Sequence, residues 1–253
     1  MTPAQGSVSP GPPAPPTPPA PPRGDAKGLY VRDMFTAIAP RYDFLNHLLS
    51  LNIDRRWRRL AVDRLNWDAA PDGRYLDLCA GTLDLAAELA MRAGFWGRVV
   101  GADFVVPMLQ RGAGKAVGVS AVGADALELP FADGHFDGCT VGFGARNLAD
   151  LDRGLREMGR VLKPGARLVI LEFTTPTRWP VRPLYLFYFR RVLPLVGRLV
   201  SKHKTAYRYL PDSVNDFPSP PDLRKRFEAA GFSSVGWKPL TFGIACLHWG
   251  TRR

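Results

Sequence analysis

Three short polar sites, each placed where a predicted strand ends, could together hold a nucleoside. Gly81-Thr82 lies in the tight turn after the first predicted strand. Asp103 closes the next strand about twenty residues later, where a carboxylate can accept hydrogen bonds from both hydroxyls of a ribose. Asp125-Ala126 follows a third strand, where an acid or amide could meet an adenine amino group. Because the three sites occur in order at strand ends, we interpret them as one binding site rather than as three unrelated caps.

The turn at Gly81 indicates which kind of nucleoside ligand to expect. Asp77 precedes it, and its single glycine has Ala80 before it and Leu83 two positions after it. Dinucleotide-binding turns carry several glycines because their backbone must approach a pyrophosphate closely. A ligand without a pyrophosphate needs fewer glycines, so the turn favours S-adenosyl-L-methionine over NAD.

Alternating strands and helices must position these sites. Apolar runs predict strands at 74–78, 98–103, 136–141 and 167–173. Helical patterns lie between them at 83–94, 105–116 and 150–162, and a further helix and strand follow at 219–232 and 240–250. This order predicts an α/β fold with a doubly wound, mostly parallel sheet, whose ligands bind at the carboxyl ends of the strands.

The chain divides into an arm and one domain. Residues 1–24 are rich in proline and contain no acidic residue, so we expect a disordered arm. Residues 25–253 are numerous enough for one domain with a large buried core. The cysteines and histidines are few and scattered, which argues against disulfides and against a metal site.

Positive charge is concentrated in two places. The net charge is +11, and the stretch from Phe173 to Pro211 has eight basic residues and no acidic one. A second basic cluster, "RRWRR", lies at 55–59. Such patches bind polyanions, either nucleic acid or an anionic membrane surface, and charge alone does not choose between them.

From about Asp33 onward, the chain resembles the UbiE/MenG/Coq5 family of quinone-biosynthesis C-methyltransferases. The motifs "APRYDFLN", "FGARN" and "YRYLP" are specific to that family, whereas "RVLKPG" occurs in many methyltransferases. The longest matching stretch covers residues 142–173. The resemblance implies a class I S-adenosylmethionine-dependent methyltransferase fold with an N-terminal helical lid.

The resemblance also implies which residues bind the cofactor, S-adenosyl-L-methionine: Gly81, Thr82, Asp103, Asp125 and Ala126. Gly142 stands where a serine of the family often contacts the cofactor, while Ala80 and Leu83 stand where glycine is common. We expect the loop to function if Leu83 points outward and the methionine part of the cofactor rests on the Gly81-Thr82 backbone.

Methylation of a hydroquinol ring, which the resemblance implies, needs an electron-rich carbon, and deprotonation of a ring hydroxyl supplies it. Arg146 would stabilise the oxyanion, and Asn147 would orient the ring or a water molecule. Tyr42, with Asp43 and Asn46, lies in the helix expected to close over the site. The structural alternatives are that Arg146 caps a helix and Tyr42 packs in the lid. We expect His203 and His248 to be structural.

The implied substrate is a polyprenylated quinol, which resides in the bilayer. Residues 178–204 are rich in apolar and aromatic side chains, but arginines and prolines interrupt them, so we expect no membrane span. The segment is either a helix packed on the sheet or an interfacial helix whose arginines meet lipid phosphates. We therefore expect a cytoplasmic protein in peripheral contact with the anionic inner face of the cell membrane. The sequence leaves open whether it forms a homo-oligomer.

Several alternatives remain at this stage. A composition rich in Ala, Arg and Pro is typical of a GC-rich bacterium and favours the menaquinone pathway, demethylmenaquinol to menaquinol, over the benzoquinol of the ubiquinone pathway. An RNA methyltransferase would fit the charge, but its Asn-Pro-Pro-Tyr signature is replaced here by "GFGARN", so we expect no nucleic-acid partner. The altered turn also leaves open a catalytically inactive binding module.

Overall fold

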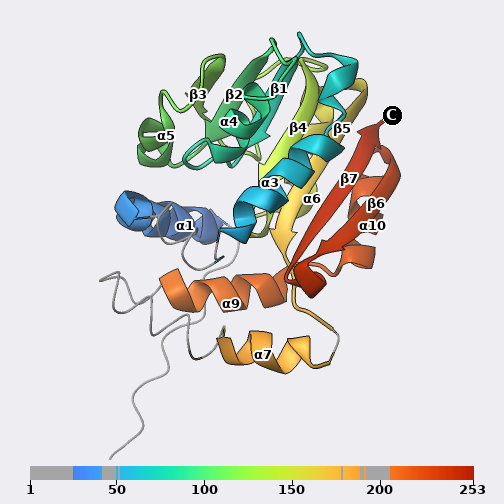
Figure 1. The fold of residues 1–253 in the computed structure, drawn as a ribbon. Helices are drawn as coiled ribbons and strands as arrows, with labels where there is room; N and C mark the ends of the chain where they lie inside the picture. The colour runs from blue at the N-terminus through green and yellow to red at the C-terminus, as the bar shows by residue number, and fades with distance from the viewer. Residues whose placement is uncertain (1–24, 42–49, 51, 178, 189–190, 192–205) are drawn as a thin grey trace, which may run out of the picture.

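A seven-stranded sheet runs through the molecule in the order β3-β2-β1-β4-β5-β7-β6 (Figure 1). This computed structural model describes residues 25–41, 50, 52–177, 179–188, 191 and 206–253. The strands are β1 (Arg74–Leu78), β2 (Arg98–Asp103), β3 (Val119–Gly123), β4 (Phe136–Gly142), β5 (Leu162–Phe173), β6 (Phe232–Leu240) and β7 (Ala245–Arg252). Strands β1 to β5 are parallel, and β7 is antiparallel to both β5 and β6. The predicted doubly wound, mostly parallel sheet is confirmed.

Helices cover both faces of the sheet. One core cluster joins it to α3 (Ile53–Arg64), α4 (Asp84–Ala90) and α5 (Val106–Gly112). The other cluster joins it to α6 (Leu151–Val161) and α10 (Pro220–Ala229). In β5, Leu168 and Ile170 belong to the second cluster, whereas Val169 and Leu171 belong to the first. This is why the sequence of β5 is apolar without interruption, as in a strand buried on both faces.

Three further helices lie beyond the carboxyl ends of the parallel strands: α1 (Asp25–Ile38), α7 (Val181–Phe187) and α9 (Ala206–Asp216) (Figure 1). Val31 and Met34 of α1 pack against Tyr209 of α9, with Phe104 from the loop after β2 beside them. Helix α1, the first helix that the structure describes, therefore covers the carboxyl ends of the parallel strands (Figure 1). The predicted lid residues 42–46, the arm at 1–24 and His203 lie outside the described residues.

The structure corrects several predicted boundaries. Helix α4 ends at Ala90 and α5 at Gly112, because Met91 and then Ala113 (ψ 130°) leave helical backbone geometry. The strand predicted at 240–250 begins only at Ala245, after a 3₁₀ turn at Thr241–Gly243. Strand β6 was not predicted, because its sequence, "FSSVGWKPL", contains glycine and proline, which interrupt a strand pattern. These residues are tolerated there because β6 lies at the edge of the sheet.

The basic cluster at 55–59 is partly structural. It lies on α3, where Trp57 and Arg58 are buried. Arg58 forms an ion pair with Asp54 one turn earlier and another, of 3.3 Å, with Asp84 at the start of α4. The other three arginines of the cluster are exposed. One arginine of this cluster, Arg58, therefore fixes α3 to α4, while the other three face solvent.

Candidate functional site

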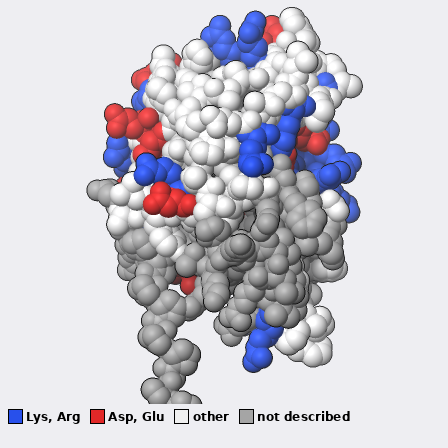
Figure 2. Space-filling view, turned by 90° about the vertical axis from the view of Figure 1, so that its left-hand side faces the viewer, with Lys and Arg blue, Asp and Glu red and all other residues white. Residues whose placement is uncertain are grey.

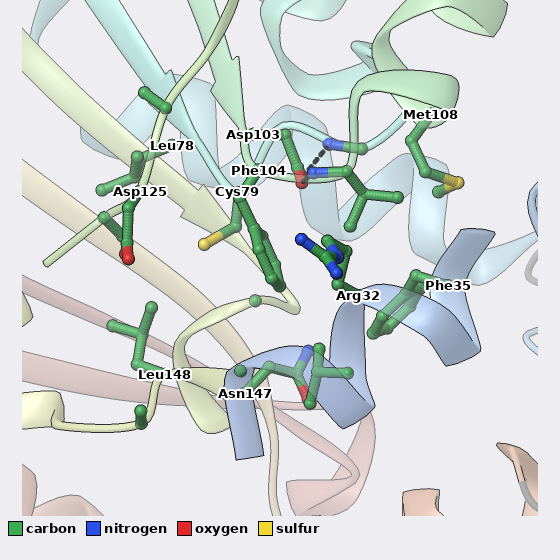
Figure 3. A pocket seen from close by; sticks show the side chains of 18 of the residues that line it. Arg32, Phe35, Leu78, Cys79, Asp103, Phe104, Met108, Asp125, Asn147 and Leu148 are labelled. Carbon is green, nitrogen blue, oxygen red and sulfur yellow. Dashed lines mark hydrogen bonds between the residues drawn. The ribbon is translucent and has the colours of Figure 1, made fainter. Parts of the chain in front are cut away.

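A cavity of about 320 Å³ lies between α1 and the carboxyl ends of β1, β2 and β4 (Figure 3). Among the predicted cofactor residues, the cavity is lined by Gly81, Asp103, Asp125, Ala126 and Gly142. Thr82 is buried and is not one of the lining residues. Of the predicted catalytic residues, Asn147 lines the cavity and Arg146 does not, while Tyr42 lies outside the described residues.

The turn from β1 into α4 has an unusual backbone. Cys79, Gly81 and Leu83 all have positive φ, at 54°, 52° and 64°. Only glycine adopts such angles without strain, so the turn stores strain at Cys79 and Leu83. The Leu83 amide donates to the Ala80 carbonyl over 2.8 Å, which closes the turn. The turn brings the Gly81 backbone to the cavity wall.

The expectation that Leu83 points outward is wrong. Its side chain is 2% exposed and belongs to the core cluster between the sheet and α3, α4 and α5. It occupies space left by two glycines, since a Cβ added to Gly101 or Gly112 would come within 2.9 Å of a Leu83 side-chain atom. The leucine therefore leaves the cavity clear by packing into the core.

Asp103, at the end of β2, is held by the backbone on both carboxylate oxygens. The amide of Gly81 donates to Oδ2 and the amide of Val105 donates to Oδ1, each over 2.8 Å. Burial raises the pKa of Asp103, and the hydrogen bonds from Val105, Gly81 and Phe104 oppose that rise. Its carboxylate is thus fixed in orientation at the cavity wall, with lone pairs left to accept hydrogen bonds from a ligand.

Asp77 supports the turn from behind. Its Oδ2 accepts from the Ala86 amide and its Oδ1 from the Thr140 hydroxyl, both at 3.0 Å. Burial raises the pKa of Asp77 to about 7, against the hydrogen bonds from Thr140 and Ala86. This carboxyl joins β1 to α4 and β4, so its role in the structure is to hold the turn.

Asp125 and Gly142 also line the cavity. The Oδ1 atom of Asp125 accepts from the Leu127 amide over 2.9 Å, which orients that carboxylate at the wall. Gly142 ends β4, where an added Cβ would lie 3.3 Å from a Leu85 methyl group. A serine would fit there only if Leu85 of α4 shifted slightly. The close packing of α4 therefore explains why this chain has glycine at position 142.

Arg146 belongs to a buried ion pair in the 3₁₀ turn η3 (Ala145–Asn147). Its Nη1 donates to Glu172 Oε1 over 2.7 Å and also to the Phe143 carbonyl. Glu172, at the end of β5, is fully buried and also accepts from the Arg146 amide over 3.2 Å. Glu172 was not identified from the sequence, although an acidic residue inside the apolar run "RLVILEF" was a signal for it.

Helices α1 and α9 hold the same turn from outside. Lys27 Nζ donates to the carbonyls of Arg146 and Leu148, each over 2.9 Å. The Tyr209 hydroxyl donates to Asn147 Oδ1 over 3.1 Å. Burial lowers the pKa of Lys27, with Asp216 opposing that change and Arg146 adding to it. The turn that presents Asn147 is therefore clamped by two helices distant in sequence.

Sequence reasoning missed the α1 wall of the cavity. Arg32 and Phe35 of α1 line it, opposite Phe104 and Met108 from the β2–α5 segment (Figure 3). The sequence did contain a signal for this wall, because the stretch that matches the family begins in α1 and includes Phe35. Within the described residues, no group of three or more His, Cys, Asp or Glu side chains could hold a metal ion.

Comparison with known proteins agrees with this geometry. The family model described as the ubiE/COQ5 methyltransferase family matches residues 23–252. The chain is 51% identical over 223 residues to a demethylmenaquinone methyltransferase of Thermus thermophilus, covering 87% of this chain and 100% of that protein. It is 46% identical over 232 residues to a ubiquinone/menaquinone biosynthesis C-methyltransferase UbiE of Geotalea daltonii, covering 89% and 97% of the two chains.

A solved structure gives independent support for the fold. A SAM-dependent methyltransferase of Thermotoga maritima superposes with a TM-score of 0.60 at 17% identity, covering 87% of this chain and 99% of that one. Such a likeness concerns the fold alone, and it confirms the class I methyltransferase fold. With the family match over nearly the whole chain and close relatives along most of its length, this chain belongs to the ubiE/COQ5 methyltransferase family.

Proposed function

We propose that this protein transfers a methyl group from S-adenosyl-L-methionine to a ring carbon of a polyprenylated quinol, converting demethylmenaquinol to menaquinol. Relatives at 46–51% identity are named demethylmenaquinone methyltransferase, which supports this substrate. The structural observation that carries the proposal is the Asp103 carboxylate, fixed at the cavity wall by the amides of Gly81 and Val105.

The residues of the cavity fit this cofactor. Asp103 would accept hydrogen bonds from the ribose hydroxyls, and Asp125 would accept one from the adenine amino group. Phe104, Val105 and Met108 provide an apolar wall for the adenine ring. The cavity volume of about 320 Å³ is typical of small-molecule sites. When bound, S-adenosyl-L-methionine supplies an electrophilic methyl group on a sulfonium.

We assign roles toward the quinol to two residues of η3, Arg146 and Asn147. Asn147 lines the cavity, so its amide can orient the ring, and Tyr209 fixes that amide by donating to its oxygen. Arg146 does not line the cavity, so we propose that its guanidinium, kept in place by Glu172, stabilises the negative charge that develops on the ring oxygen through its electrostatic field rather than by direct contact.

We also propose that α7 brings the enzyme to an anionic membrane surface. Trp179, Leu184 and Phe187 are 84%, 68% and 63% exposed, and Tyr185 anchors the helix by being buried. Large apolar side chains exposed beside a basic residue, here Arg182, are typical of interfacial helices. Among the described residues, no helix is long and apolar enough to cross a bilayer. On the part of this face that the structure describes, basic and acidic side chains are mixed (Figure 2).

The test is a methyl-transfer assay on the purified chain with labelled S-adenosyl-L-methionine. A naphthoquinol and a benzoquinol acceptor with the same short prenyl chain are compared at equal concentration. We expect label in the naphthoquinol ring carbon. Transfer to the benzoquinol alone would assign the protein to the ubiquinone reaction, and transfer to neither in a folded, cofactor-binding protein would contradict the proposal.

A further inference from the structure

Arg32, on α1, is the basic side chain at the cavity wall. Among the described residues that line the cavity, the charged ones are Asp103, Asp125 and Arg32. Figure 3 shows the Arg32 side chain directed from α1 into the cavity. The described wall therefore has two carboxyl groups and one guanidinium, and that guanidinium lies on α1, across the cavity from the strand ends (Figure 3).

The acids of the cavity do not neutralise Arg32. Both oxygens of Asp103 and one oxygen of Asp125 accept hydrogen bonds from backbone amides. Among the ion pairs of the described residues, Arg32 is found with Asp33, its neighbour in sequence, at 3.6 Å. Both side chains of that pair are at least half exposed, at 50% and 76%, so solvent screens the interaction. Arg32 can exchange this contact for a ligand at little cost.

We propose that Arg32 binds the carboxylate of the methionine part of the cofactor, an assignment that rests on the proposed function. The cofactor carries a sulfonium, an ammonium and a single carboxylate, so that carboxylate is its only anionic group. A planar guanidinium can donate two parallel hydrogen bonds to a carboxylate. Asp103 and Asp125 then serve the hydroxyl and amino groups of the adenosine, and each charged residue of the wall has a chemically matched group on the ligand.

Two other partners for Arg32 predict different behaviour. If Arg32 stabilised the oxyanion of the quinol, its loss would lower turnover without changing cofactor affinity. If it bound a phosphate, the cavity would prefer a nucleotide to an adenosyl amino acid. The carboxylate assignment predicts instead a loss of affinity that depends on whether the ligand has a carboxylate.

The test is calorimetric titration of the full chain with S-adenosylhomocysteine and with decarboxylated S-adenosylhomocysteine, which keeps the adenosine and the amine. We expect wild-type protein to bind the first about 10-fold more tightly, the lower end of the range for charge-assisted hydrogen bonds because Arg32 is half exposed. Arg32→Gln should remove this preference by weakening only the carboxylate ligand. Arg32→Lys should keep part of it.

A matched control is Arg111→Gln, which changes an exposed arginine of α5 that does not line the cavity. It should leave both affinities unchanged. The assignment is overturned if Arg32→Gln keeps the wild-type preference, if it weakens both ligands equally, or if wild-type protein prefers adenosine monophosphate to S-adenosylhomocysteine. If wild-type protein binds neither adenosyl ligand, the proposed function itself fails.

Discussion

The Gly81 amide donates a hydrogen bond to the Asp103 carboxylate over 2.8 Å, joining residues that are 22 positions apart in the chain. The bond ties the turn after β1 to the end of β2. One carboxylate therefore orients the turn at the cavity wall and, in the proposed function, also presents acceptors to the ribose of the cofactor. Loss of Asp103 removes two functions at once.

Asp103→Ala should weaken binding of S-adenosylhomocysteine by about one to two orders of magnitude. Each charge-assisted hydrogen bond contributes roughly 1.5–3 kcal/mol, and the turn also loses its support. Calorimetric titration measures the affinity, and circular dichroism checks folding. Asp68→Ala, which removes an exposed acid outside the cavity, is the control. Near wild-type affinity in a folded Asp103→Ala protein would contradict the cofactor assignment.

Arg146→Ala should reduce kcat by about 10²–10³ if its guanidinium stabilises developing charge. It should also lower the free energy of unfolding by about 3–5 kcal/mol, because Glu172 is left buried without its partner. The double variant Arg146→Met/Glu172→Leu removes the unpaired charge and should regain most of that stability while remaining inactive. Recovery of turnover in the double variant would show that Arg146 acts only in folding.

Deletion of residues 1–24 should change neither stability nor turnover, because α1 begins at Asp25. Deletion of residues 1–27, or Lys27→Met, should lower kcat by about 10-fold, since hydrogen bonds from a charged group to the turn are lost. Steady-state kinetics with a short-chain quinol compares the three proteins. If Lys27→Met keeps the kcat of the 1–24 deletion, the hydrogen bonds from Lys27 to the turn have no importance for catalysis.

Leu184→Ser/Phe187→Ser should reduce sedimentation with anionic liposomes by about one order of magnitude or more, because two large apolar side chains are lost from the exposed face of α7. Activity on a short-chain quinol in solution should be retained. Trp96→Ser/Val117→Ser changes apolar residues elsewhere that are even more exposed, at 72% and 97%, and serves as the control. Equal loss in both double variants, or no binding by wild-type protein, would be evidence against docking through α7.

The free energy of unfolding should decrease as the pH is lowered, because His248 is buried. This side chain is 2% exposed, and burial lowers its pKa to about 4 from an ordinary value of 6.5. As the pH falls below 6.5, the unfolded chain takes up a proton that the folded chain does not bind until about pH 4. Stability is therefore lost between pH 6.5 and 4, by about 3 kcal/mol. In urea unfolding, His248→Leu should show a smaller loss over this range, and an identical pH dependence would contradict the assignment.

The sheet and most of the cofactor wall were predictable because they depend on local pattern. Apolar runs identified β1, β2, β4 and β5. The residues at the ends of β1, β2 and β3 identified Gly81, Asp103 and Asp125. Parallel strands bring their carboxyl ends to one edge, so their order in sequence was sufficient to predict a common site.

The remaining features depend on packing between distant segments. The inward position of Leu83 follows from space at Gly101 and Gly112, which the turn sequence does not reveal. The pairing of Arg146 with Glu172 requires η3 to lie beside the end of β5, which only the register of the sheet determines. Recognition of Arg32 required knowledge that α1 covers the cavity.

Helix α1 takes part in two tasks, since it walls the cavity and its Lys27 holds the turn that presents Asn147. These two tasks are physically coupled, because any displacement of α1 from the strand ends would also withdraw Lys27 from the carbonyls of Arg146 and Leu148.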